Sequence, residues 1–147
     1  MKTKLLLFAA VLTAMISCAS LSSFAQNEEQ PHIFVVQTWS RNMGPDINRA
    51  QADSLVRYYH ENVVMKNPKL LSSRTMSHFF SADSREYVFI LEYKSLTDME
   101  AAFLIDDENE KKLWPDKKAR EGYDKMWSKH FGHHADAIYA EIPGTRK

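Results

Sequence analysis

The hydrophobic pattern of the chain alternates between two periods. Segments rich in β-branched and aromatic residues predict four strands, over 32–40, 70–81, 86–94 and 135–142. Between them, apolar residues recur at helical spacing from about Ile47 to the stop signal Asn67-Pro68, and again from about Asp98 to Gly132. The predicted order of elements is therefore β-α-β-β-α-β.

Local signals divide the second helical region. Thr97 and Glu100 form a capping box, so we expect the helix to begin at about Asp98. The charged run 106–112 predicts a break in this helix. Pro115 then suits the first position of a further helical segment, and Gly132 suits its C-terminal cap.

A β-α-β-β-α-β order is typical of an α+β, ferredoxin-like fold, in which two helices cover one face of a four-stranded antiparallel sheet. The other face cannot be fully polar here, because it carries Met76, Phe80, Val88 and Ile90. A second copy of the chain is the simplest cover, since symmetric dimers are the commonest oligomers. We therefore expect a homodimer.

The first 25 residues have the pattern of a secretory signal peptide. Lys2 and Lys4 precede the apolar run Leu5–Ile16, which is too short to span a bilayer as a helix. Cleavage after Ser23-Phe24-Ala25 would release the protein, whereas the box Met15-Ile16-Ser17-Cys18 would leave a lipid anchor on Cys18. We expect an exported protein, periplasmic or secreted or anchored through Cys18, with a linker over 26–31 and one domain over 32–143.

Charge and cysteine content exclude several classes of function. The chain has 19 basic and 19 acidic residues, and loss of Lys2 and Lys4 leaves 17 against 19. This balance argues against a nucleic-acid partner, which would require a basic excess. The only cysteine, Cys18, lies in the signal region, so the domain itself has no thiol for a disulfide, a nucleophile or a zinc site. No later segment is long and apolar enough to span a membrane.

The predicted hairpin contains one group of candidate site residues. A turn centred on Asp83 places Arg74 opposite Glu92, with His78 on the same face. Together with Trp39, these residues would line a barrel pocket, where a histidine beside a carboxylate can act as an acid or a base. The alternative is an ordinary cross-strand Arg–Glu pair beside a half-exposed histidine.

Histidines near the C-terminus form a second candidate group. The sequence His-Phe-Gly-His-His supplies His130, His133 and His134, and imidazoles can bind haem iron or a metal ion. The alternative is a capped helix end, where histidine favours the negative end of the dipole. His60 stands alone, and we expect it at the surface.

Aromatic residues form a third group: Trp39, Trp114, Trp127, Tyr58, Tyr59 and Tyr123. They would line a site for a planar ligand, or alternatively pack in the core or at a dimer contact. The sequence contains no glycine-rich phosphate loop, nucleophile elbow or HExxH motif. It therefore assigns no catalytic residue.

The opening strand His-Ile-Phe-Val-Val, the strand Arg-Glu-Tyr-Val-Phe-Ile-Leu-Glu-Tyr and the aromatic-rich second helical region resemble the dimeric α+β barrel superfamily over residues 32–142. This superfamily includes antibiotic-biosynthesis-monooxygenase-like proteins and stress-responsive barrel proteins. The resemblance implies a dimeric barrel but no particular activity, because the superfamily has no single catalytic signature. Two hypotheses follow: an exported protein that binds a small apolar or planar ligand, or a monooxygenase-like or haem-binding or haem-degrading enzyme that uses His78 or a histidine of the second helical region.

Overall fold

The computed structural model describes residues 30–80 and 82–145. Contacts divide the chain into two units, Met1–Gln30 and Pro31–Lys147, and the structure below is that of the second. The expected signal peptide, both of its cleavage sites and linker residues 26–29 lie outside the described residues.

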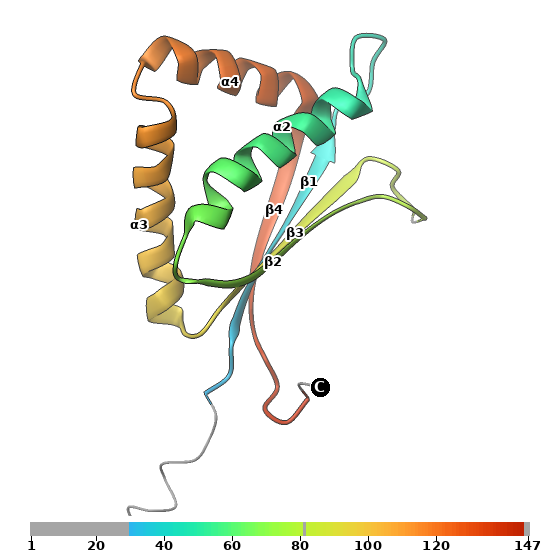
Figure 1. The fold of residues 1–147 in the computed structure, drawn as a ribbon. Helices are drawn as coiled ribbons and strands as arrows, with labels where there is room; N and C mark the ends of the chain where they lie inside the picture. Colours follow the sequence, from blue (N-terminus) through green and yellow to red (C-terminus); the bar gives the residue numbers. More distant parts are fainter. Residues whose placement is uncertain (1–29, 81, 146–147) are drawn as a thin grey trace, which may run out of the picture. The chain divides into compact units, whose positions relative to one another are not determined.

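The element order confirms the predicted ferredoxin-like fold (Figure 1). The strands form one antiparallel sheet in the order β2-β3-β1-β4. The elements are β1 (Ile33–Arg41), α2 (Arg49–Asn62), the 3₁₀ turn η1 (Val64–Lys66), β2 (Leu70–Ser77), β3 (Glu86–Tyr93), α3 (Leu96–Leu113), α4 (Lys117–His130) and β4 (Phe131–Ala140).

Three helices, rather than the expected two, pack over one face of the sheet (Figure 1). The odd-numbered positions of β1 and β3 point toward these helices, because side chains alternate along a strand. Two apolar clusters result. One joins Val35, Leu91 and Tyr93 to Met99 and Ala102 of α3. The other consists of residues from α2, β3 and β4: Ala52, Val56, Tyr87 and Phe131.

The predicted break over 106–112 is wrong, because α3 continues through this run to Leu113. The glutamates and lysines of this run are good helix formers, and the Lys111–Asp107 ion pair joins neighbouring turns. The helix ends instead before Pro115, which disfavours helical geometry at the residue that precedes it. Pro115 is not the first residue of α4, since Asp116 caps that helix by accepting a bond from the amide of Lys118 at 2.9 Å.

The predicted capping box of α3 is also displaced. Ser95 is the N-cap, and its Oγ accepts a hydrogen bond of 3.1 Å from the amide of Asp98. Thr97 therefore already lies in the first helical turn. The sequence Ser-Leu-Thr-Asp offers a cap two residues earlier than Thr97-Asp-Met-Glu, and the extended backbone of Ser95 after β3 selects it.

Gly132 does not cap α4, which ends at His130 and leads directly into β4. The cap comes instead from Asn42, whose Nδ2 donates to the carbonyls of Ser128 and Lys129 at 3.3 and 3.0 Å. A Cβ atom on Gly132 would lie 2.7 Å from Oδ1 of Asn42. A side chain at this position would therefore displace the amide of Asn42 that caps α4.

The hairpin register differs from the prediction by two residues. Arg74 pairs with Ile90, and Ser72 pairs with Glu92. The shift is already present beside the turn, where Ser77 pairs with Tyr87, and β2 ends at Ser77 rather than at 81. A shift of two preserves the face on which each side chain lies, so the predicted division into two faces still holds. Two other boundaries also differ: α2 begins at Arg49, capped by Asn48, and β4 covers Phe131–Ala140 rather than 135–142.

The second face of the sheet, called the open face below, has no helix over it (Figure 1). Its apolar side chains, placed by the strand pairing, are Phe34, Val36, Met76, Val88, Ile90, Ala137 and Tyr139. Phe80, which we expected on this face, lies in the β2–β3 connection and is almost fully exposed. None of the helices in the described part of the chain is long and apolar enough to cross a membrane.

Candidate functional site

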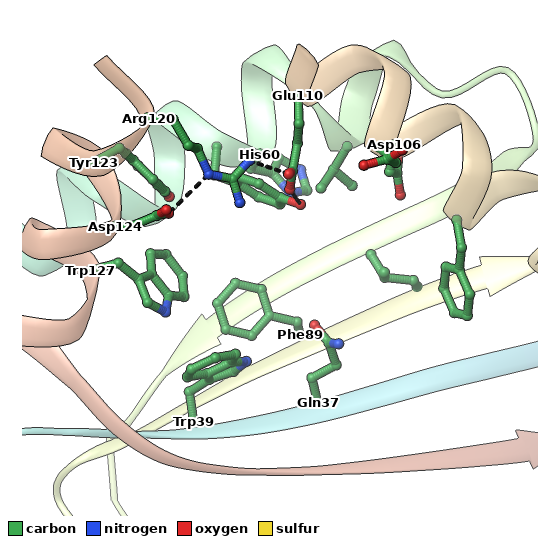
Figure 2. Close-up of a pocket in the computed structure, with 15 residues that line it drawn as sticks. Gln37, Trp39, His60, Phe89, Asp106, Glu110, Arg120, Tyr123, Asp124 and Trp127 are labelled. Carbon is green, nitrogen blue, oxygen red and sulfur yellow. Dashed lines mark hydrogen bonds and ion pairs between the residues drawn. The ribbon is translucent and has the colours of Figure 1, made fainter. Parts of the chain in front are cut away.

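A cavity of about 460 Å³ lies between the sheet and the helices (Figure 2). Its floor comes from β1 and β3, and its walls come from α2, η1, α3 and α4. The lining residues are Gln37, Trp39, Tyr59, His60, Val64, Phe89, Leu91, Phe103, Asp106, Asp107, Glu110, Arg120, Tyr123, Asp124 and Trp127. Its size and largely apolar lining are those of a small-molecule site.

Aromatic rings dominate one end of the cavity. Trp39 and Trp127 meet edge to face, with ring centroids 5.2 Å apart, and Phe89 lies beside them on the floor. Tyr123 continues this surface, at 5.9 Å from Trp127. The predicted aromatic group is thus brought together, with Trp39, Tyr59, Tyr123 and Trp127 at the cavity, whereas Tyr58 and Trp114 pack behind Tyr123.

A chain of hydrogen bonds and ion pairs crosses the opposite wall. Tyr59 of α2 donates to Oε1 of Glu110 at 2.6 Å, and Nη1 of Arg120 pairs with the other oxygen of Glu110. Nε of Arg120 donates to Asp124 at 3.0 Å (Figure 2). The network joins all three helices around the cavity, so it holds the wall in one arrangement.

Asp106 is the carboxylate of this wall that has no cationic partner. Its Oδ1 accepts a hydrogen bond of 2.7 Å from Asn67, and it forms no ion pair within residues 30–80 and 82–145. Burial raises the pKa of Asp106 to about 6, and the charge of Glu110 adds to this effect, whereas the Asn67 bond opposes it. A carboxyl group that titrates near neutral pH inside a cavity is a candidate acid–base group.

Burial favours the neutral forms of the two tyrosines and the histidine of the cavity. Burial, reinforced by Glu110, raises the pKa of Tyr59, and burial likewise raises the pKa of Tyr123. Burial lowers the pKa of His60, although the charge of Glu61 opposes this. His60 is half-buried and lines the cavity, so the expectation of a surface histidine is wrong.

The residues predicted from the hairpin do not share one site with Trp39. Trp39 lies on the helix-covered face and lines the cavity, whereas the strand register places Arg74 and Glu92 on the open face. There, Glu92 accepts hydrogen bonds from Nδ1 of His32, at 2.6 Å, and from Ser72. The backbone amide of His78 bonds to Glu86 just beyond the end of β2. A role for Arg74, His78 and Glu92 in a pocket remains a prediction.

The three C-terminal histidines are separated. His130 is fully buried, with Nδ1 at 2.9 Å from the carbonyl of Met126 and Nε2 at 3.3 Å from Gln51. His134 stacks on Trp39, with ring centroids 4.2 Å apart, while His133 is exposed. Among the described residues, no group of three or more histidine or acidic side chains is placed to hold a metal ion.

Sequence reasoning missed the polar wall: Asp106, Glu110 and Arg120. The run 106–112 was interpreted as a solvated break, but Asp106 and Glu110 follow Met99 and Ala102 at spacings of three and four residues. Residues at these spacings share one face of a helix. The signal was therefore present as polar residues on the buried stripe of a continuous α3.

Solved structures confirm the fold. A dimeric ferredoxin-like protein from an uncultured marine organism is 7% identical, with a TM-score of 0.55 over 84% of this chain and 98% of that one. A mutant of SnoaB, a cofactor-independent oxygenase from Streptomyces nogalater, is 8% identical, with a TM-score of 0.51 over 80% and 99%. A NIPSNAP-like domain protein from Burkholderia xenovorans is 11% identical, with a TM-score of 0.51 over 80% and 91%.

No protein-family profile matches the chain, and no curated protein sequence matches it significantly. The structural matches show that the chain has a ferredoxin-like fold, shared with proteins described as dimeric. At these sequence identities they show the fold alone.

Proposed function

We propose that this chain is an exported, homodimeric α/β barrel protein that binds a small planar, largely apolar ligand between its sheet and its helices. The observation that carries the proposal is the cavity of about 460 Å³ with Trp39, Phe89 and Trp127 along one side. Aromatic faces favour planar ligands through offset stacking and edge contacts. Gln37 supports the binding of such a ligand, because its amide reaches the cavity from an otherwise apolar floor and can orient a polar group of the ligand (Figure 2).

The open face supports the dimer. Phe34, Val36, Val88 and Ile90 form an apolar surface across the two central strands, and nothing in the described chain covers it. Patches of this kind mark interfaces in soluble proteins. Proteins of the same fold are described as dimeric.

Ligand binding is tested with a panel of two- and three-ring aromatic compounds. A compound that binds only the folded state stabilises it by about 2.7 kcal/mol at a hundred times its Kd, so thermal unfolding will detect it. Crystals soaked with such a compound should show it against Trp39 and Trp127. Stabilisation with the compound seated elsewhere on the molecule would contradict the proposal.

Export is tested by intact mass. Cleavage after Ala25 gives a mature protein that begins at Gln26. A diacylglycerol-modified Cys18 would instead identify a lipoprotein, and an uncleaved chain would contradict export.

A second candidate function, a monooxygenase-like or haem-handling enzyme, is favoured by one observation. Asp106 lies at the cavity with a pKa of about 6, so its carboxylate can accept a proton from a bound substrate near neutral pH. The test is oxygen consumption and haem titration with the purified protein. Substrate-dependent turnover that is lost in Asp106→Asn would support an enzyme over a binding protein.

A further inference from the structure

The charges around the cavity determine which planar ligand it suits. Four of the lining residues are acidic, namely Asp106, Asp107, Glu110 and Asp124, and Arg120 is the one lining residue with a permanent positive charge. Arg120 is already engaged by both Glu110 and Asp124, and Asp107 pairs with Lys111. Excess negative charge therefore remains in this wall, at Asp106 and across the Glu110–Arg120–Asp124 group.

The same wall already holds one cation over an aromatic ring. The guanidinium carbon of Arg120 lies 5.0 Å from the ring centroid of Trp114. Cations are attracted to the faces of tryptophan and tyrosine by the ring quadrupole, and more strongly where water is excluded. Further aromatic rings line the cavity, at Trp39, Trp127 and Tyr59.

We propose that the ligand is a planar organic cation, such as an N-alkylated or protonated nitrogen heterocycle, with Asp106 as its counter-charge. This inference rests on the proposed ligand-binding function and specifies its ligand class. The cation's ring lies on the aromatic floor, and its positive charge faces α3. A neutral ligand of the same shape gains only the ring contacts, whereas an anion faces carboxylates on two helices and is rejected.

The test compares three probes of similar shape by calorimetry on the purified protein at pH 8 and low salt: N-methylquinolinium, 1-methylnaphthalene and 1-naphthoate. We expect the cation to bind about tenfold or more tightly than the neutral probe, with naphthoate weakest, and this preference to shrink at high salt. A neutral or anionic probe that binds tightest would overturn the inference and leave the binding function standing. If none of the three probes binds at millimolar concentration, both fail.

Two variants locate the counter-charge. Asp106→Asn keeps an oxygen that can accept from Asn67, and we expect it to lose about fivefold or more of the cation's affinity while the neutral probe is unaffected. Glu108→Gln is the matched control: it also removes one negative charge from α3, at an exposed residue that does not line the cavity, and affinity should change by less than about twofold. Equal losses in the two variants would show that only net charge matters and would overturn the assignment of Asp106. The comparison of probes in the unaltered protein needs neither variant to fold.

Discussion

Asn67, in the turn that follows α2, donates one hydrogen bond to the carbonyl of Ala102 and another to the carboxylate of Asp106, at 2.9 and 2.7 Å. Asn67 itself is only 6% exposed. This amide therefore fixes α3 against the end of α2, and it turns an acidic side chain toward the cavity. Asp106 is thus a half-buried carboxylate with no cationic partner among the residues that the structure describes.

A buried carboxylate without a cationic partner lowers the free energy of unfolding, so Asp106→Asn should raise it. The folded pKa of Asp106 is about 6, above its ordinary value of 3.8, so folding binds protons between these values and stability is lost as pH rises through 6. The full shift corresponds to about 3 kcal/mol, and partial exposure reduces our expectation to about 1 kcal/mol. Denaturant unfolding at pH 8 should show the variant more stable, with the difference vanishing below pH 4.

A variant that is no more stable than the parent at pH 8 would show that Asp106 is solvated. Its placement as the uncompensated charge of the cavity would then fail. If Asp106→Asn both raises the free energy of unfolding and weakens cation binding, the carboxylate lowers stability but is needed for binding.

The start of α3 gives a second prediction. Ser95→Ala removes the acceptor for the amide of Asp98 and should lower the free energy of unfolding by about 1 kcal/mol. Thr97→Ala, two residues on, makes no such cap and should change stability by less than about 0.5 kcal/mol. Chemical denaturation of the two variants side by side decides between the two caps. A larger loss for Thr97→Ala would restore the predicted capping box.

The two faces of the sheet illustrate what the sequence could predict. Alternation along Tyr87-Val88-Phe89-Ile90-Leu91 identifies which side chains share a face, and this is independent of a register shift of two. The hairpin register itself depends on where β2 ends and the turn begins, and this has no clear local signal. The residue pattern could therefore not predict the partner of Arg74, but it could predict which side chains share a face.

The cavity was predictable only in part. Trp39, Tyr59 and Trp127 are recognisable as aromatic positions on a strand and on helix stripes, and the structure brings them together. The acidic wall could not be predicted, because a run of charged residues, taken by itself, has the pattern of a solvated surface. Its burial follows from tertiary contacts, such as the Tyr59–Glu110 hydrogen bond, which no local pattern encodes.

The open face gives a third prediction. Ile90→Asp would place a carboxylate in the apolar seam of the proposed dimer and should yield a monomer or an aggregate, because an unpaired buried charge is strongly disfavoured. Leu104→Asp makes the same kind of change on the exposed surface of α3 and should leave the dimer intact. Light scattering at micromolar concentration measures both. A monomeric parent protein would contradict the barrel dimer.

The most direct test of the central claim is the affinity of a planar ligand after the cavity has been filled from its floor. Gln37 lies on β1 between Val35 and Trp39, and its side chain points into the cavity (Figure 2). Gln37→Trp should occupy that space and weaken binding of the tightest planar probe by at least about tenfold, whereas Gln37→Ala, which leaves the space open, should stay within about threefold of the parent. Calorimetry at 25 °C on folded protein provides the comparison. Unchanged affinity in a folded Gln37→Trp variant would place the ligand outside this cavity and would contradict the account.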